Sequence, residues 1–255
     1  MAITGSGIPT NRTNIQLPND VSAEILQKTQ EGSMVMQLAR QIALPGRGVQ
    51  IPVIAGDPEA AWVAETGVKP VSNPTLDKKI MQAHKLAVIV PFSDEFRRDA
   101  ASLYDALIAR LPGVLAKKFD ETVFFGPSSG TLANFDNFST VTGYALDDSG
   151  KTAYDGLVAA DTAVSTQGGT ITGFAFSPQG RGVLLGAQDA DKRPLFINSA
   201  AEGAVNRLLG APVYFSAAAY KAGTSGSGAT PDIVGFAGDW THAMYGVVEG
   251  VKIDY

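Results

Sequence analysis

The spacing of apolar residues alternates along the chain between strand-like and helix-like periods, and these changes predict where its elements lie. Residues 49–53 (VQIPV) alternate apolar and polar positions, as a strand with one buried face does. Because Pro52 has no N–H to donate, we expect an edge strand. A second strand is expected over residues 80–90. Residues 55–79 between them are rich in Gly, Pro and Asp and too many for an ordinary turn, so we expect a projecting loop or a long hairpin.

The longest amphipathic helix is expected from Ser102 to Val123, where Leu, Val and Phe recur every three or four residues. Ser102 and Asp105 form a start that is similar to a capping box, and the Gly-Pro pair at 126–127 ends the helix. Pro112 should kink or divide it.

Shorter elements complete an α+β outline in two regions, 21–126 and 140–255, without an internal repeat. Short helices are expected at 21–32, 33–44, after Ser93, at 154–165 and after Pro178. Further strands are expected at 170–176, 195–197, 213–215, 233–236 and 244–248.

Two segments lack the apolar residues to bury a face of their own. Residues 1–20 are polar, contain Gly and Pro, and are expected to form an extended arm. The segment 55–79 carries Trp62 on a stretch too poor in apolar residues to make a core. An exposed aromatic side chain on an edge-like strand is usually covered by a partner. The alternative is that Trp62 folds back on its own domain.

Composition narrows the class of protein. With 45% hydrophobic and 18% charged residues, the 255-residue chain is globular and can bury one large core or two modest ones. Its net charge of -5 argues against a dedicated nucleic-acid binder, and the lack of cysteine removes disulfides and thiolate chemistry. The longest apolar run, residues 86–91, is far shorter than the about 20 residues of a transmembrane helix. Residues 1–10 do not resemble a signal peptide, so we expect a soluble protein made in the cytoplasm.

The residue types that form active sites in known enzymes do not occur here in the patterns that catalysis requires. A hydrolytic triad can be drawn from Ser177, Asp239 and His242, but Ser177 lacks the glycine two positions earlier that a nucleophile elbow has. Neither His84 nor His242 has metal-ligand spacing, and neither glycine-rich stretch matches a phosphate-binding loop. We expect no catalytic residue, no cofactor and no metal site.

Charged pairs are expected mostly at the surface. The carboxylates at 120–121 and at 147–148 are neighbours in sequence and need not converge on one substrate, so we expect solvated positions. Arg97 and Arg98 could clamp a carboxylate between them, and the alternative is a solvated charged face.

Five segments carry a family signal through their order and spacing. They lie at residues 17–39, 48–100, 119–126 (FDETVFFG), 208–216 (LLGAPVYFS) and 232–253 (DIVGFAGDWTHAMYGVVEGVKI). Taken together, they resemble the major capsid proteins of tailed bacteriophages with the Hong Kong 97-type fold.

The resemblance implies an α+β capsid fold of four parts. These are an N-terminal arm at 1–20, a peripheral domain with a long helix at 21–48 and 80–139, an extended loop at 49–79, and an axial domain at 140–255. By analogy, the extended loop lies over the neighbouring subunit, and axial domains meet around five-fold and six-fold axes, with residues 177–230 lining capsomer centres. The expected inter-subunit contacts are Trp62, Glu65, Lys69, Arg97 and Arg98.

The sequence departs from the family at its end. Members usually continue with strands that return to the peripheral domain, whereas this sequence stops at Tyr255, so these strands are expected to be missing. Either the sequence is truncated or its tail end is unusual. Some members join subunits through a Lys in the extended loop and an Asn near the C-terminus. Lys69 is a candidate donor, but the region that would hold its partner is absent.

The expected function is a structural subunit of an icosahedral phage shell that forms hexamers and pentamers and encloses double-stranded DNA. Its partners would be copies of itself, with scaffold, portal and decoration proteins as further candidates. It would assemble in the host cytoplasm, reside in the virion and bind no membrane. The rivals are an encapsulin-like nanocompartment shell, a serine hydrolase using Ser177 and His242, and a phage tail or adhesion protein, against which the long helix argues.

Overall fold

A computed structural model describes most of the chain from Lys28 to Val248. The described residues are 28–30, 32–46, 48–56, 58, 60–63, 71, 74–90, 101–128, 132–146, 152–189, 191–196, 205–224 and 230–248, of which 101–105 are described by their backbone alone. The expected arm at residues 1–20 lies outside this part.

Helices and strands alternate irregularly along the chain, which gives a mixed α and β fold. The helices are α2 (Met34–Leu38), α4 (Ala101–Phe125), α5 (Ala153–Thr166) and α6 (Pro178–Gly186), with short 3-10 turns η1 (Ala217–Ala219) and η2 (Trp240–His242). The strands are β1 (Arg40–Ala43), β2 (Val49–Gly56), β3 (Thr75–Met81), β4 (Gly173–Phe176), β5 (Arg207–Leu208), β6 (Ala211–Phe215), β7 (Gly235–Gly238) and β8 (Met244–Val247).

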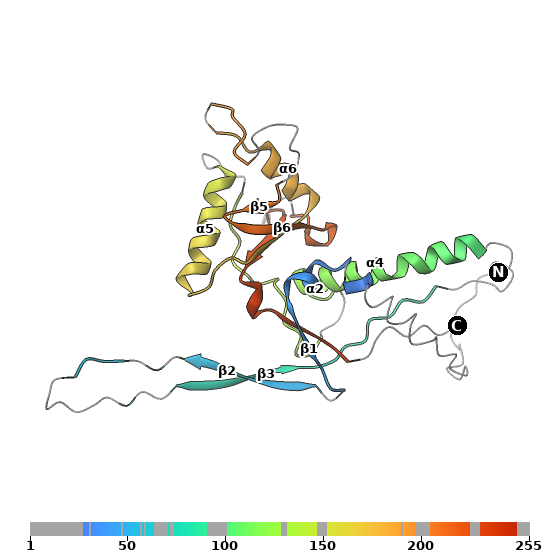
Figure 1. Cartoon of the computed structure of the whole chain (residues 1–255), viewed down its shortest axis with the longest axis horizontal. Helices are drawn as coiled ribbons and strands as arrows, with labels where there is room; N and C mark the ends of the chain where they lie inside the picture. The colour runs from blue at the N-terminus through green and yellow to red at the C-terminus, as the bar shows by residue number, and fades with distance from the viewer. Residues whose placement is uncertain are drawn as a thin grey trace.

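The molecule has three extensions around a small centre (Figure 1). The antiparallel hairpin of β2 and β3 projects to one side, and α4 projects to the other. Above them stands a four-stranded sheet of order β5-β6-β4-β7 with α5 and α6 beside it. The hairpin and the first turns of α4 therefore project away from the packed centre, in opposite directions.

Strand β4 lies between two hydrophobic clusters and contributes side chains to both. Its residues are all buried, and because side chains alternate across a strand, Phe174 and Phe176 face one cluster while Ala175 faces the other. The Phe174 cluster packs α5 and α6 on the sheet. Its buried members are Leu157, Phe174, Phe176, Leu184, Val205, Leu208 and Ala211.

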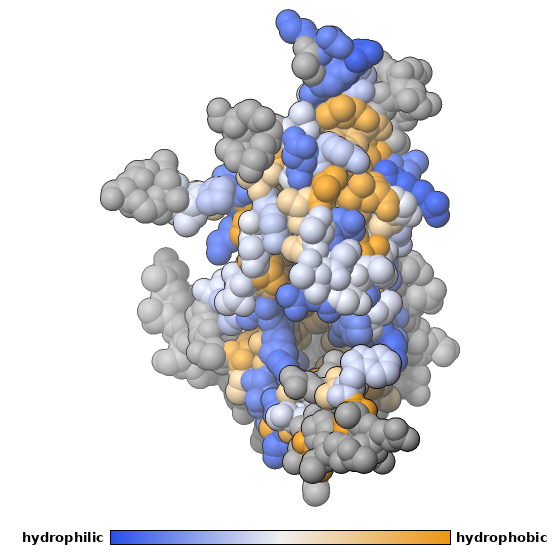
Figure 2. Space-filling model, turned by 90° about the vertical axis from the view of Figure 1, so that its left-hand side faces the viewer, coloured by the Kyte–Doolittle hydropathy of each residue, from blue (hydrophilic) through white to orange (hydrophobic). Residues whose placement is uncertain are grey.

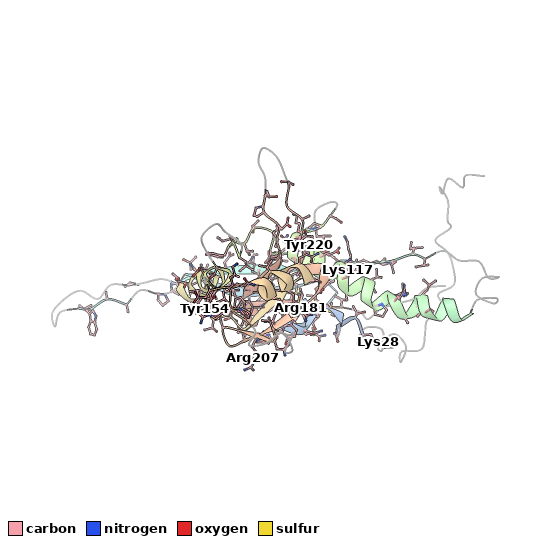
Figure 3. All side chains as sticks on the ribbon, turned by 90° about the horizontal axis from the view of Figure 1, so that it is seen from above. Lys28, Lys117, Tyr154, Arg181, Arg207 and Tyr220 are labelled. Carbon is pink, nitrogen blue, oxygen red and sulfur yellow. The ribbon has the colours of Figure 1, made fainter. Side chains whose placement is uncertain are left out.

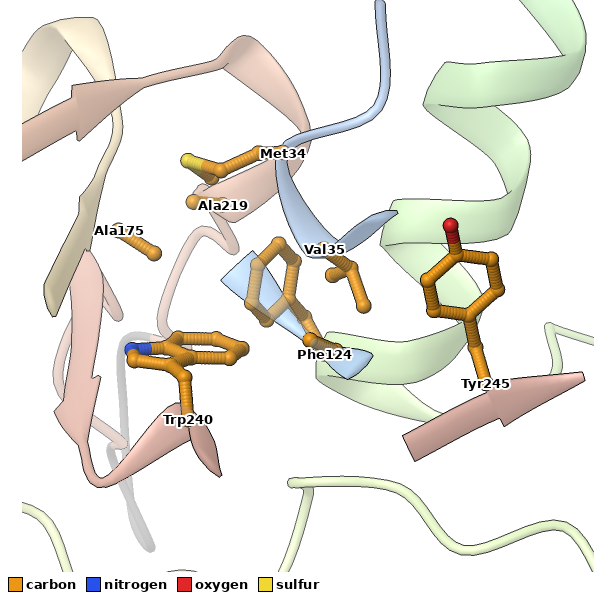
Figure 4. Packing of buried hydrophobic residues seen from close by; sticks show 8 residues of the cluster. Met34, Val35, Phe124, Ala175, Ala219, Trp240 and Tyr245 are labelled. Atoms are coloured by element: carbon orange, nitrogen blue, oxygen red, sulfur yellow. The ribbon is translucent and has the colours of Figure 1, made fainter. Parts of the chain in front are cut away.

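The second cluster joins the sheet to the long helix (Figure 4). Phe124 of α4 is completely buried and stacks on Phe236 of β7 with ring centroids 4.6 Å apart. Trp240 closes the cluster, and its indole N–H donates to the carbonyl oxygen of Gly173 at 2.9 Å. The buried members of this cluster are Met34, Val35, Ala39, Phe124, Ala175, Ala219, Trp240 and Tyr245.

The expected helix over residues 33–44 is wrong in its second half. Helix α2 ends at Leu38, and residues 40–43 form β1, which pairs in parallel with β8. The partner strand explains the difference, because apolar spacing within one segment says nothing of a strand some 200 residues away. This pairing brings the end of the described chain beside a segment that we assigned to the peripheral domain. The expected domain boundaries themselves stay predictions.

Three other expectations on secondary structure need correction. The strand expected over 80–90 ends at Met81, and residues 82–90 continue without regular structure. The strand expected at 195–197 is absent over its described residues 195–196, because the chain there makes only an isolated bridge between Gln188 and Pro194. Pro112 is buried and does not divide α4, which runs unbroken from Ala101 to Phe125.

The stacked ring at Phe124 is expected to dominate the stability of the centre. Replacing Phe124 by Ala should lower the free energy of unfolding by about 3–5 kcal/mol, because it removes a fully buried ring and leaves a cavity. Urea unfolding followed by circular dichroism measures this loss. Val114→Ala, on the same helix but 52% exposed, is the matched control and should change stability by less than about 1 kcal/mol. Equal losses in the two variants would contradict the prediction.

Candidate functional site

The hairpin carries an exposed apolar pair, Ile54 and Leu76. In the antiparallel register, Ile54 stands opposite Leu76, and cross-strand partners share one face of the ribbon. Their relative exposures are 64% and 73%. At the base of the hairpin, the pair Val49 and Met81 is half-buried. The hairpin thus contacts its own body near the base and leaves the Ile54–Leu76 face, which we call the hairpin face, open to solvent.

Trp62 lies beyond the end of β2 and is fully exposed, at 106% of its reference area. The alternative that Trp62 folds back on its own domain is therefore wrong. Val71, on the way back to β3, is 87% exposed. A soluble monomer rarely gathers several large apolar side chains on one extension, so the pattern is typical of a surface that meets a partner.

Two contacts fix the base of the hairpin to the segment 132–146. The ammonium group of Lys79 lies 2.9 Å from the Asp136 carboxylate, whose hydrogen bond and charge raise the pKa of Lys79. The His84 ring contacts the Ala133 carbonyl oxygen through Nε2 at 2.9 Å and meets the edge of the Phe135 ring at 6.0 Å. Because both partners of the ion pair are largely exposed, its contribution to stability is at most about 1 kcal/mol. The contacts orient the hairpin more than they stabilise the fold.

Asp120 contradicts our expectation of a solvated carboxylate. It is completely buried, and its oxygens accept hydrogen bonds from the Ser33 hydroxyl at 2.5 Å and from the backbone N–H groups of Met34 at 2.8 Å and Val35 at 3.3 Å. The Ser33 hydroxyl in turn accepts from the Met36 N–H at 3.1 Å. The first turn of α2 is thus capped jointly by its own serine and by a carboxylate from α4.

Burial sets the ionisation of Asp120. Removal of the carboxylate from water raises its pKa, and the hydrogen bonds from Ser33, Met34 and Val35 oppose that rise without cancelling it. The group therefore fixes α2 to α4 at an electrostatic cost.

The residues of the imagined triad have structural roles. Ser177 is completely buried, donates its hydroxyl to the Val234 carbonyl oxygen at 2.9 Å and accepts from the Gly180 N–H as the N-cap of α6. Asp239 caps η2 through the Thr241 N–H and hydroxyl, which hold the pKa of its carboxyl below the usual value. His242 is mostly exposed, with Nε2 3.8 Å from an Asp239 oxygen. A hydroxyl that is buried and bonded on both sides is a poor nucleophile.

The remaining predicted site residues, Glu65, Lys69, Arg97 and Arg98, lie outside the described residues. Within the part that is described, no group of three or more His, Cys, Asp or Glu side chains is placed to hold a metal ion. A search of the same part for a helix long and apolar enough to cross a membrane also finds none.

Comparison with known proteins identifies the family of the chain. The sequence pattern of the phage capsid family matches residues 14–255. The chain belongs to the phage capsid family. A protein named probable major capsid protein gp17, from Mycobacterium phage D29, is 23% identical over 249 residues, which cover 93% of this chain and 74% of that protein.

Solved structures agree with this membership. A chain from Mycobacterium phage Bobi superimposes with a TM-score of 0.65 at 26% identity, covering 85% of this chain and 72% of that one. A structure titled capsid of native GTA particle computed with C5 symmetry gives a TM-score of 0.62 at 21% identity, with coverages of 82% and 79%. At that identity the second likeness concerns the fold alone. The membership and the superpositions agree on a phage capsid fold with mixed helix and sheet content.

Asp120 should give this capsid protein an unusual dependence of stability on pH. Since the pKa of the folded carboxyl is raised above 3.8, the folded state binds more protons than the unfolded state between 3.8 and the raised value. The stability of the wild type relative to Asp120→Asn should therefore fall as pH rises through that window and level off above it. Urea unfolding of both proteins at a series of pH values measures the difference.

The matched control is Glu121→Gln, which removes the neighbouring carboxyl of the same helix. Its difference from the wild type should vary less over the same pH range. A difference between the wild type and Asp120→Asn that stays constant, or grows with rising pH, would contradict the assigned ionisation.

Proposed function

We propose that this chain is the shell subunit of an icosahedral phage capsid of the Hong Kong 97 type, which assembles into hexamers and pentamers around double-stranded DNA and performs no catalysis. The observation that carries the proposal is the hairpin face with its neighbour Trp62. Ile54, Leu76 and Trp62 are 64%, 73% and 106% exposed on an extension that lacks a core of its own. An element of that kind is useful to a subunit that is always surrounded by copies of itself.

The proposed working contact is between the hairpin of one subunit and the body of the next. Burial of apolar side chains stabilises a contact by roughly 25 cal/mol per Å² of apolar surface removed from water. Each contact is weak by itself, but a subunit in a closed shell makes several at once, so their effects combine in the whole particle. Glu65 and Lys69 on the same loop, together with Arg97 and Arg98, remain proposed members of such contacts.

The charge of the chain suits the proposed cargo. A net charge of -5 keeps the shell from gripping the phosphates of DNA tightly, so the nucleic acid is enclosed without specific binding. Scaffold, portal and decoration proteins are proposed as further partners, with assembly in the host cytoplasm and residence in the virion. An encapsulin-like shell would show the same architecture around a protein cargo, and the contents of the particles separate the two functions.

Electron microscopy of the purified protein tests the proposal. We expect closed shells for the wild type and their loss in Ile54→Asp, because a carboxylate on the hairpin face would have to be buried without a partner. The protein concentration needed for assembly should rise at least about tenfold, which corresponds to about 1.4 kcal/mol per subunit.

Two controls accompany this variant. Val141→Asp places the same charge at a 56% exposed position on the body and should assemble normally. Because Ile54 is exposed in the single chain, Ile54→Asp should keep the circular dichroism spectrum and unfolding midpoint of the wild type. Discrete small oligomers of the wild type under every assembly condition would contradict the proposed shell.

A further inference from the structure

The two faces of the β2–β3 ribbon are exposed to different degrees near its base. Val49, Ile51 and Met81 share one face, because side chains alternate along each strand, and all three are half-buried. The hairpin face, with Ile54 and Leu76, lies on the other side of the ribbon and is exposed. The ribbon therefore turns its first face toward its own body where it leaves the centre.

A glycine and one apolar contact form the joint between the ribbon and the body. Met81 lies against β8, since a Cβ atom placed on Gly246 would be 3.1 Å from the Met81 sulfur. Gly48, just before β2, has a φ of 83°, and a Cβ atom there would be 2.6 Å from the Met81 carbonyl oxygen, so only glycine fits this turn. Because a methionine side chain adapts its shape easily, this joint fixes where the hairpin starts but not its direction.

Polar contacts on the same side of the ribbon can fix that direction. Lys79 lies on the same face of β3 as Met81, and its ammonium group is 2.9 Å from the Asp136 carboxylate. His84, three residues after Met81, contacts the Ala133 carbonyl oxygen at 2.9 Å. Figure 2 looks at the molecule from the hairpin side and shows mainly hydrophilic surface between the hairpin and the apolar patches above it. Polar contacts, more than apolar packing, therefore hold the angle between the hairpin and the body.

The segment that supplies these partners is anchored in the centre of the molecule. Phe138 lies two residues after Asp136. Its ring packs edge to face on Trp240 with centroids 5.7 Å apart, and its N–H donates to the Val123 carbonyl oxygen at 2.8 Å. The ring centroids of Phe138 and Phe124 are 6.3 Å apart. The Asp136 carboxylate is thus held at a fixed place beside the core, and it can act as a reference point for the hairpin.

A small rotation at the base becomes a large displacement at the far end of the hairpin. Strand β2 has 8 residues, so at roughly 3.3 Å per residue it extends about 26 Å. A rotation of about 10° moves its end by about 4.5 Å, close to the spacing of about 4.8 Å between neighbouring strands. Figure 3 shows the hairpin and α4 leaving the body in opposite directions within one thin layer. A rotation out of that layer changes the angle at which one subunit meets the next.

We infer that Lys79 and Asp136 are positioning residues for assembly, which hold the hairpin at one angle to the body and so set the curvature and size of the closed shell, an inference that rests on the proposed shell function. An exposed ion pair shifts an equilibrium between two hairpin angles by at most about fivefold. Every subunit of a shell carries the same shift, so its effect is repeated around the whole particle.

Distances between two spin labels test the hairpin angle in the unassembled subunit. Since the chain has no cysteine of its own, Leu76→Cys on the hairpin and Val158→Cys on α5 place the labels at exposed positions without competing thiols. We expect one narrow distance distribution, and a distribution at least about twofold wider when Lys79→Asp or Asp136→Lys is added. The combined variant Lys79→Asp/Asp136→Lys restores opposite charges and should restore the narrow distribution.

Lys78→Asp is the matched control for these distances. Lys78 is the neighbouring lysine, but its side chain lies on the opposite face of β3, so its replacement should leave the distance distribution of the unassembled subunit unchanged. A distribution that stays narrow in both Lys79→Asp and Asp136→Lys overturns the inference. An equal widening in Lys78→Asp, or no recovery in the combined variant, overturns it too.

Electron microscopy of assembled particles gives the second readout and separates the inference from the function on which it rests. The wild type and the combined variant should form shells of one diameter, whereas Lys79→Asp should form shells of mixed diameter or open sheets. Shells of a single, unchanged diameter in both single variants overturn the inference and leave the shell function standing. If the wild type forms no shells at all, the proposed function fails, while the spin-label distances still decide whether the ion pair sets the hairpin angle.

Discussion

The last two turns of α4 hold the molecule together. Phe124 stacks on Phe236 and fixes the helix to the sheet, and Asp120, one turn earlier, accepts the Ser33 hydroxyl and the first N–H groups of α2. Tyr245 of β8 meets Phe119 edge to face at 6.5 Å, which adds the β1–β8 pair to the same helix. Elements more than 200 residues apart, from Ser33 to Tyr245, therefore depend on one short stretch of helix, and a loss there would disturb all of them.

Outside that centre and the Phe174 cluster, the described parts of the chain bury few apolar side chains. Among the described residues, the hairpin is half-buried at its base, and two exposed polar contacts, at Lys79 and at His84, orient it. On the sheet, α5 buries Leu157 and leaves Tyr154 and Val158 outside. Small centres with apolar extensions are unstable arrangements for a free protein, but they suit a subunit whose neighbours complete its burial.

The sequence predicted those elements whose pattern is local. The long helix, α5, the strand at 49–53 and the exposure of Trp62 all follow from the spacing of apolar residues and from segments too poor in them. The missed features depend on partners distant in sequence. Asp120 was interpreted as solvated because its neighbour Glu121 made the pair look like a charged surface, yet a carboxylate at an apolar-facing position of the helix is a signal for a buried cap. No local pattern marks β1, whose partner begins at Met244.

The hairpin also shows why copies of such a chain would meet by their faces and not by their edges. A two-stranded ribbon is marginally stable alone, and its open edges invite further strands. Here Pro52 removes one edge N–H, a bulge between Ile54 and Gly56 breaks the regular ladder, and residues 77–79 (DKK) place charges along β3. These features disfavour the addition of another strand. The side chains of Ile54 and Leu76, in contrast, lie on one face of the two-stranded ribbon and not along its edges. Edge protection combined with an apolar face favours a contact that is specific and limited to one layer, as a closed shell requires.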